Sequence, residues 1–524
     1  MKKFSINLIG AALLLFTLNG CTDDLNTEPK IEKTLEQLLA EDPEAINGML
    51  SKLYAAFALS GPDGPGSSDL VGDDAGESPF LRNIINLQDF TADGLKNRWG
   101  DNGLDQLTTT SQWDENNKFF RYLYNRVYYV IPQCNNIIVA LDNADVPNSE
   151  AYKSEIRFLR AMAYFYMIDC FGKGVLVTEA DADAGISQPK PEASRIELFN
   201  FVESELLAIE DATPMTTSYG RTNKSAVRML LARLYLNAQV YTGEAHYSEA
   251  LTYAAKVIDE GGYSLAPDFV SLFSGDNNQG QAQNEIIYAL LADPVVSQSY
   301  GNTTYLVQGS LLAETMTVNE YGVTGNGWGG HRATKAWYGL FGNSAAALAA
   351  SPDERAQLFW TTGHSFEMND YKIWVDGFPS IKYRNTNFTG SSVATEFSGT
   401  DFPVFRLADA YLMYAECVVR GAGGSPTTAL QYVNLVRQRS NAAAISSGDL
   451  DLDFILDERG RELNFEGIRR TDLIRFGKFT GGAYLWPWKG GVKDGTAIPA
   501  TYNVFPIPLT ALQANPNLTQ NPGY

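Results

Sequence analysis

Apolar residues recur at helical spacing in several parts of this chain. In residues 154–172 they alternate at spacings of three and four, at Ile156, Leu159, Ala163, Tyr166 and Cys170. This is the period of one helix face, and Gly172 predicts where the helix ends. A second periodic run follows Ser194, a residue type that often caps a helix N-terminus. The pattern predicts a mostly α-helical protein.

Two segments show the same paired pattern of apolar stripes. Residues 223–263 contain two stripes separated by a turn at Gly243, and residues 406–440 contain another such pair. Small alanines at the facing positions, with a tyrosine near the turn, resemble a tetratricopeptide hairpin. Two unrelated helical hairpins would give a similar pattern. Hairpins of this kind stack into a scaffold and carry no chemistry themselves.

Two long segments lack any regular period. Residues 60–115 and 271–400 are rich in Gly, Asn, Ser, Thr and aromatic residues. Long irregular segments in a large folded protein are usually functional. The part after Phe476 is also loop-rich, and we expect no regular structure in residues 506–524, where Pro and Asn are frequent.

The N-terminus has the pattern of an export signal. Residues 1–20 begin with two lysines and continue as a short apolar run, too short to span a membrane. The run ends at Cys21 in Leu-Asn-Gly-Cys, which resembles a bacterial lipobox whose cysteine is lipidated. An ordinary cleaved signal is the alternative. Residues 21–40 then read as a lipid-anchored tether.

Composition narrows the classes of partner. Of the 524 residues, 44% are hydrophobic and 19% are charged, as in a folded globular protein. The formal net charge of −21 argues against binding nucleic acid, whose phosphates need clustered basic residues. It also argues against a basic face lying on an anionic membrane. Aromatic residues make up 12% of the chain, and many lie in the Gly-rich loops.

Metal chemistry has little support in the sequence. Cys134, Cys170 and Cys417 lie in helical patterns and read as buried thiols, and the three histidines are far apart. We therefore expect no metal site and no cofactor. The oxygen-rich residues 275–285 leave a structural calcium ion open, although their spacing does not match an EF-hand.

Acidic residues offer two candidate sites for chemistry. Asp73, Asp74 and Glu77 form a dense loop cluster that fits a polar ligand, a cation, a glycosidase-type carboxylate pair or plain turn residues. Residues 457–479 alternate acids and bases at spacings suited to ion pairs along one structural helix. The chain contains no nucleophile elbow, P-loop or dinucleotide fingerprint.

Several stretches, taken together and in order, resemble the SusD/RagB family of outer-membrane glycan-binding lipoproteins. They are the lipobox, "RFLRAMAYFYMIDCFG", "YGRTNKSAVRMLLARLYLNA", "FRLADAYLMYAE", the charged segment and the terminal "NPGY". The resemblance implies a tetratricopeptide-like scaffold with a loop-rich ligand face, glycan binding without cleavage, and a SusC-like TonB-dependent transporter as partner. It also implies a cell-surface location on the outer membrane.

The loops "DDAGESPFLRN" and "RWGDNG" look closest to those of the family's starch-binding founding member. The resemblance implies stacking of Trp99 on sugar, polar contacts from Asp74, Arg82 and Asn102, and two further aromatic contacts. We match the latter to Tyr300 and Trp328, the second in a loop of different length and composition. A starch-type α-glucan is therefore the favoured ligand, and a laminarin-type β-1,3-glucan is the alternative.

The resulting organisation has three parts after the tether. Residues 41–270 form an N-terminal helical region that contains the ligand loops 60–115. Residues 271–400 form a loop-rich ligand-binding region, and residues 401–524 form a helical hairpin, a charged helix and an extended tail. Two functions of other classes compete with glycan capture: a surface glycoside hydrolase, and an interaction protein whose hairpins bind a partner peptide.

Overall fold

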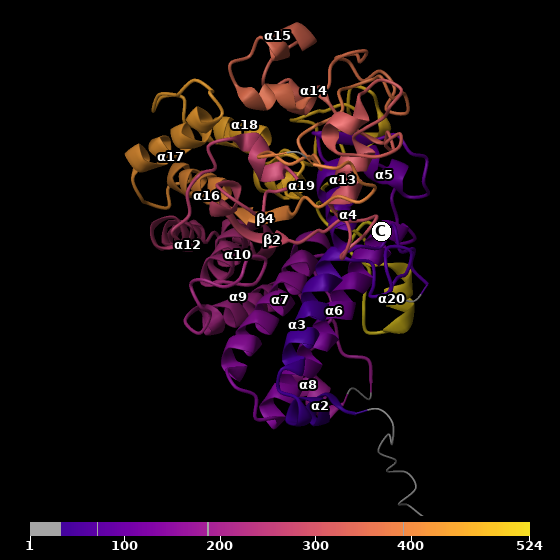
Figure 1. Ribbon diagram of the computed structural model, residues 1–524, viewed down its shortest axis with the longest axis vertical. Helices are drawn as coiled ribbons and strands as arrows, with labels where there is room; N and C mark the ends of the chain where they lie inside the picture. Colours follow the sequence, from indigo (N-terminus) through magenta and orange to yellow (C-terminus); the bar gives the residue numbers. More distant parts are fainter. Residues whose placement is uncertain (1–32, 71, 186–187, 391) are drawn as a thin grey trace, which may run out of the picture.

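The computed structural model describes residues 33–70, 72–185, 188–390 and 392–524 (Figure 1). The predicted signal segment, Cys21 and the first part of the tether lie outside the described residues. Helices dominate, so the predicted mostly α class is confirmed. Ser194 caps its helix as expected, because its backbone N–H donates to the Glu197 carboxylate at 2.7 Å while its hydroxyl accepts from the Glu197 N–H.

Long helices pack side by side as a layered scaffold in the lower and left parts of Figure 1. Successive neighbours are α6 with α7, α7 with α9, α9 with α10, and α10 with α12. The helices of the N-terminal half are α2 (Leu35–Glu41), α3 (Ala45–Ala58), α4 (Phe80–Ile85), α5 (Leu104–Thr108), α6 (Lys118–Asn143), α7 (Ser149–Cys170), α8 (Glu179–Ala184), α9 (Arg195–Glu210), α10 (Lys224–Leu236), α11 (Ala238–Thr242) and α12 (Tyr247–Glu260).

Both predicted hairpins are present, and they lie next to each other. The second consists of α16 (Leu407–Val419) and α17 (Pro426–Arg439), and α16 packs on α12 of the first. Ala250 and Ala254 are fully buried in α12, as is Ala429 in α17, so the small residues do lie where helices meet. The scaffold is thus continuous in space although residues 261–406 separate its two hairpins in the chain.

That intervening segment forms much of the loop-rich upper end of the molecule in Figure 1. One antiparallel ribbon joins it to the N-terminal part, where β1 (Leu95–Asn97) pairs with β3 (His331–Ala333). A second ribbon lies within the segment, where β2 (Ile286–Leu290) pairs with β4 (Phe402–Arg406). Its short helices are α13 (Thr303–Gly309), α14 (Lys335–Tyr338) and α15 (Ala345–Ala349).

The C-terminal part differs from the prediction in two ways. The charged segment is not one helix but two, α18 (Leu452–Leu463) and α19 (Arg469–Arg475), because Phe465 and Gly467 take positive φ between them. The tail also contains a short helix, α20 (Leu509–Ala514), preceded by Pro508. A proline just before a helix supplies a suitable φ, so its presence did not exclude helix.

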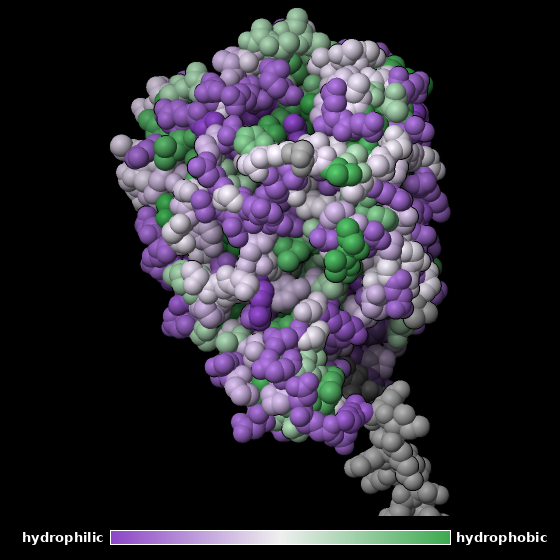
Figure 2. All heavy atoms as spheres, viewed as in Figure 1, coloured by the Kyte–Doolittle hydropathy of each residue, from purple (hydrophilic) through white to green (hydrophobic). Residues whose placement is uncertain are grey.

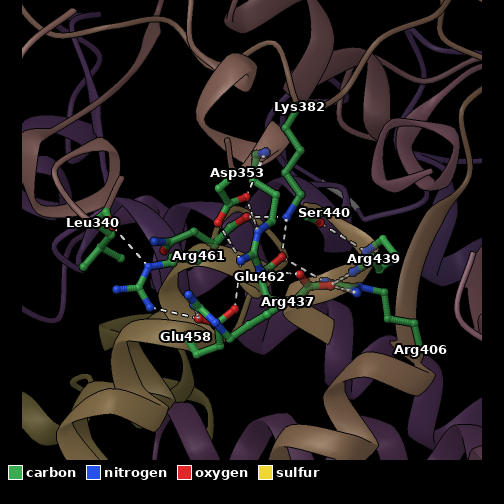
Figure 3. Close-up of polar contacts among 12 residues, drawn as sticks. Leu340, Asp353, Lys382, Arg406, Arg437, Arg439, Ser440, Glu458, Arg461 and Glu462 are labelled. Atoms are coloured by element: carbon green, nitrogen blue, oxygen red, sulfur yellow. Dashed lines mark hydrogen bonds and ion pairs between the residues drawn. The ribbon is translucent and has the colours of Figure 1, made fainter. Parts of the chain in front are cut away.

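The two glutamates of α18, Glu458 and Glu462, are buried and paired mainly with other elements rather than along the helix (Figure 3). Glu462 accepts from Arg355 at 2.8 Å, from Arg406 at 2.6 Å and from Arg439. Glu458 is likewise fully buried, and its partners include Arg355, Arg437 and Arg461. The expectation of a structural charged segment is confirmed, and the source of its partners is corrected: it joins α17, α18 and the loop-rich region. We call Glu458, Glu462 and their partners Arg355, Arg406, Arg437, Arg439 and Arg461 the ion-pair network.

The face of the molecule seen in Figure 2 is predominantly polar. In Figure 2 hydrophilic residues cover most of the visible face, and hydrophobic residues appear as small separate patches. Cys134, Cys170 and Cys417 are buried free thiols, as predicted. Within the described residues, no helix combines the length and apolar character needed to cross a membrane.

Candidate functional site

The ribbon of β1 and β3 brings two predicted ligand residues together. Asn97 pairs with His331, and the Arg98 N–H donates to the Gly330 carbonyl oxygen at 3.0 Å, which extends the ribbon by one step. Trp99 leaves one strand where Trp328 approaches the other. Their ring centroids are 6.4 Å apart, and the Trp99 indole N–H donates to the Trp328 carbonyl oxygen at 3.1 Å.

Trp99 is half-buried and packs against the core. Its ring lies 5.9 Å from Tyr305 and 5.4 Å from His331, both fully buried. A Cβ on Gly330 would lie 2.5 Å from the indole, so only glycine lets the ring settle here. Burial holds the pKa of His331 well below its usual value, so a neutral imidazole lies beneath the tryptophan.

Tyr300 continues the aromatic surface. Its ring centroid lies 6.2 Å from that of Trp328 and 5.0 Å from that of Phe397. The hydroxyl donates to Glu396 at 3.3 Å. Trp99, Trp328 and Tyr300 are all partly exposed and form one connected surface, which we call the aromatic arc. Segments about 200 residues apart in the chain supply it.

The predicted polar residues come from three elements: Arg82 belongs to α4, Asp74 to the loop before it and Asn102 to the turn before α5. The Arg82 N–H donates to the Gly301 carbonyl oxygen at 3.0 Å, next to Tyr300, and its guanidinium lies 4.5 Å from the Tyr305 ring centroid. Arg82 is 7% exposed, so much of its side chain braces the loop. Direct ligand contact by Arg82 stays a prediction.

Asp74 and Asn102 are both exposed. The Asp74 loop lies near Tyr300, since a Cβ on Gly76 would be 3.7 Å from the Tyr300 Cβ. One carboxylate oxygen of Asp74 accepts from the backbone N–H groups of Gly76 at 2.8 Å and Glu77 at 2.9 Å. This bonding fixes the turn and leaves the second oxygen for other partners. Asn102 lies three residues after Trp99, in the turn that precedes α5. Their ligand contacts also stay predictions.

The other acidic residues of the loop have protein partners. Asp73 accepts from Arg121 at 3.0 Å and from Asn125 at 3.0 Å, and Glu77 accepts from Lys118 at 2.6 Å. These bonds tie the loop to α6. The carboxylates therefore build the loop rather than standing free as an acid–base pair.

Oxygen-rich residues 275–285 are also used by the protein. The Asp276 carboxylate accepts from the N–H of Phe388 at 2.7 Å and of Thr389 at 3.1 Å, and the Asn277 amide donates to two buried carbonyl oxygens. Across the described ranges no group of three or more His, Cys, Asp or Glu is arranged to hold a metal ion. Calcium binding stays an untested expectation.

Sequence reasoning missed the residues that support the aromatic arc. Tyr305, His331 and Phe397 lie directly against its rings. Tyr305 belongs to the same "SQSYGNTTY" stretch as Tyr300, so the second tyrosine was a usable signal. Nothing local marks His331, because its role depends on pairing between strands more than 230 residues apart.

Comparison with known proteins gives matches at both ends of the chain. Residues 363–524 match the model of the SusD family, and residues 75–236 match a family described as starch-binding associating with outer membrane. The starch-binding protein SusD of Bacteroides thetaiotaomicron is 32% identical, with 100% of this chain and 99% of that protein covered. A SusD-like protein of Formosa agariphila, P25, is 24% identical over 98% of both chains.

Solved structures share the fold. A SusD superfamily protein from Parabacteroides distasonis has a TM-score of 0.71 at 23% identity, covering 92% of this chain and 99% of that one. Surface glycan-binding protein A from Bacteroides thetaiotaomicron, solved in complex with laminarihexaose, has a TM-score of 0.68 at 21% identity, covering 91% and 99%. At these identities the likeness concerns the tetratricopeptide-like fold.

Proposed function

Because this chain belongs to the SusD/RagB family, we propose that it is a non-catalytic, cell-surface glycan-binding lipoprotein. It captures a glucan and delivers it to a SusC-like TonB-dependent transporter. Cys21 carries the lipid anchor in this proposal, and the acidic tether spaces the folded part from the outer membrane.

The aromatic arc is the observation that supports this proposal most directly. A pyranose ring presents C–H groups on its faces and hydroxyl groups on its rim. Partly exposed indole and phenol rings cover such faces, and nearby carboxylate, amide and guanidinium groups satisfy the hydroxyls. Trp99, Trp328 and Tyr300 offer the first kind of contact, while Asp74 and Asn102 offer the second.

Starch-type α-glucan is the favoured ligand. The 32% identical relative is named as starch-binding and is aligned over its full length. A laminarin-type β-1,3-glucan is the alternative, since surface glycan-binding protein A was solved with laminarihexaose. The loop around Trp328 is the part of this chain in which we expect the two specificities to be decided.

Affinity electrophoresis tests the proposal with starch, laminarin, levan and pectin in parallel gels. We expect starch to retard the protein strongly and levan and pectin to leave it unretarded. Retardation by laminarin alone would replace the α-glucan assignment with the β-1,3-glucan assignment. Unchanged mobility in all four gels would contradict glycan capture and favour the peptide-binding alternative.

An assay for new reducing ends separates binding from hydrolysis. The pure protein should release none from starch or laminarin over hours. Turnover that is lost in Asp74→Asn would identify a hydrolase instead. Fractionation of Cys21→Ala in cells without the transporter tests the anchor, because the unlipidated protein should leave the membrane fraction.

A further inference from the structure

A cleft lies at the end of α5, a few residues after the loop that carries Trp99. It has a volume of about 600 Å³ and is formed by the end of α5 and by residues 488–502 of the C-terminal part. Its wall residues are mostly hydroxyl-bearing, amide or aromatic: Asp105, Gln106, Thr109, Thr110, Ser111, Gln112, Tyr371, Trp488, Thr496 and Tyr502, with glycines, Ala497, Ile498 and Pro499 completing it. The size matches small-ligand pockets in general.

Three partly exposed aromatic rings in this cleft are fixed by neighbouring groups. Trp488 and Tyr371 meet edge to face with centroids 4.9 Å apart, and the Trp488 indole N–H donates to the Met368 carbonyl oxygen at 3.3 Å. Tyr502 stacks on buried Trp113 at 4.4 Å. Rings held in this way lose little freedom when a ligand covers them, so the cleft is preorganised.

The backbone around the cleft holds unfavourable conformations. Thr110, Gln112 and Trp488 have φ of 49°, 54° and 69°, and they are three of the six non-glycine residues with positive φ in the described part of the chain. Such conformations persist only where the surroundings impose them, and they gather at ligand clamps and other functional sites. Half of these conformations lie in one cleft, and together with the fixed aromatic rings they indicate a preformed binding site.

Two anchors keep the Trp488 loop in this conformation. The Gly491 N–H donates to the Thr109 carbonyl oxygen at 3.0 Å, which joins the two walls of the cleft. Lys489 is fully buried and donates to the carbonyl oxygens of Gly481 at 2.9 Å and Tyr484 at 2.8 Å. Because Lys489 is fixed inside the protein, the preceding residue, Trp488, is held in the wall of the cleft.

The polar groups of the cleft select a neutral, hydroxyl-rich ligand. None of the residues that line it is Lys, Arg or His, so an anionic group has no cation to bind. The nearby Lys372 is paired with Asp105 at 2.6 Å. Burial, with the neighbouring Asp105 charge, raises the pKa of Tyr371 to about 12, so its hydroxyl keeps its proton and can donate.

We propose that this cleft is a second saccharide-binding site, separate from the aromatic arc and specific for neutral glucan segments. Aromatic rings cover the sugar face, and Ser111, Gln112 and Thr496 bind its hydroxyls. The choice of glucan as ligand class rests on the proposed function. The Lys372–Asp105 pair, beside Gly100, lies between the Trp99 loop and the cleft.

Isothermal titration with maltoheptaose and with laminarihexaose tests the proposal on the folded chain. The parent protein should bind the preferred glucan at two sites, and Trp99→Ala/Trp328→Ala, which removes the arc, should keep one weaker site. Adding Trp488→Gly should reduce this residual affinity at least 10-fold. Glycine suits the positive φ at position 488, so this variant should keep its fold.

Tyr371→Ala is the second cleft variant, and Trp360→Ala is the matched control, since Trp360 is partly exposed but belongs to neither aromatic group. Melting curves confirm folding of each protein. Loss of all binding in the arc variant, or residual binding that ignores both cleft variants, would overturn the second site and leave the proposed function standing. A parent protein that binds neither oligosaccharide would contradict both.

Discussion

The ion-pair network buries charged side chains, whereas the aromatic arc leaves large apolar side chains partly exposed, and both depart from the usual distribution. Glu458 and Glu462 are charged and have no exposed surface, whereas Trp99 and Trp328 are large and apolar yet remain partly exposed. Charged residues are ordinarily at the surface and tryptophans mostly covered. Each exception has a local reason: the charges are paired on several sides, and the rings lie at the end of a ribbon that holds them at the surface.

This difference separates stability from recognition. Removing one partner from a buried charge cluster leaves the others unpaired, so the network is sensitive to single changes. Removing an exposed ring takes away contact surface for a ligand while most of the interior is untouched. Substitutions in the ion-pair network should therefore lower stability, and substitutions in the aromatic arc should lower glucan affinity. Four experiments test this separation.

Glu462→Gln should have the largest effect. The amide keeps the shape but leaves Arg355, Arg406 and Arg439 without a central carboxylate. We expect the free energy of unfolding to fall by about 3–5 kcal/mol, measured by urea denaturation, with unchanged glucan affinity in the folded fraction. Glu367→Gln is the control, because its pair with Lys335 is exposed and should be worth at most about 1 kcal/mol. Equal effects of the two variants would contradict this account.

Trp99→Ala and Trp328→Ala should each weaken glucan binding about 10–30-fold in affinity gels. A covered indole removes about 60–80 Å² of apolar surface from water, worth about 1.5–2 kcal/mol. The double variant should come close to losing retardation by the polysaccharide. Trp99→Ala should also lower the melting temperature more than Trp328→Ala, because Trp99 packs on buried Tyr305 and His331. Parent-like binding by both single variants would place the principal glucan contacts elsewhere.

Asp89→Asn tests an acidic residue that, unlike the network, is buried without a cation at bonding distance among the described residues. Burial raises the Asp89 pKa to about 7 from 3.8, although the Gly467 N–H bond opposes this shift. Between these values the folded state holds a proton that the unfolded state releases, so stability falls as pH rises through this window. Relative to the parent, Asp89→Asn should gain about 2–3 kcal/mol between pH 5 and pH 8. A constant difference across this range would show that Asp89 does not titrate there.

Tyr300→Phe should have the smallest effect. The ring keeps its contacts with Trp328 and Phe397 and loses only a long hydroxyl bond to exposed Glu396. We expect less than a twofold change in glucan affinity, measured by titration calorimetry. A tenfold loss would show that the hydroxyl, rather than the ring face, contacts the ligand.

Helical periodicity predicted part of the scaffold, whereas α3 and α6 were not predicted from it. The stripes of residues 223–263 and 406–440, and the cap at Ser194, correspond to observed helices because their signals are local. The break inside the charged segment was missed because Phe465, which is not a glycine, adopts a positive φ that propensity does not predict. The alternation of acids and bases suggested ion pairs within one helix, whereas most partners of the buried glutamates are arginines of α17 and of the loop-rich region.

The sequence allowed the residues of the candidate site to be predicted, but not the strand pairing that brings them together. Tryptophans in Gly- and Asn-rich loops stood out in the sequence, and Trp99 and Trp328 do lie together. Their relation depends on the pairing of β1 with β3, which joins distant segments and leaves no periodic signal in strands of three residues. Trp374 had the same loop-like neighbourhood, yet it is 4% exposed and donates to Thr315 at 2.8 Å.

The pairing of Leu95 with Ala333 also orders the maturation of the protein in time. In the proposed function the chain is exported with its N-terminus first, so α3, α6 and α7 are delivered while Trp99 still lacks the Trp328 carbonyl and the imidazole beneath it. Sugar capture, as proposed for this surface, then begins only after residue 333 has been delivered and threaded back onto the first third of the chain. Ligand occupancy thereby requires that the first 333 residues are in place and that β3 has paired with β1.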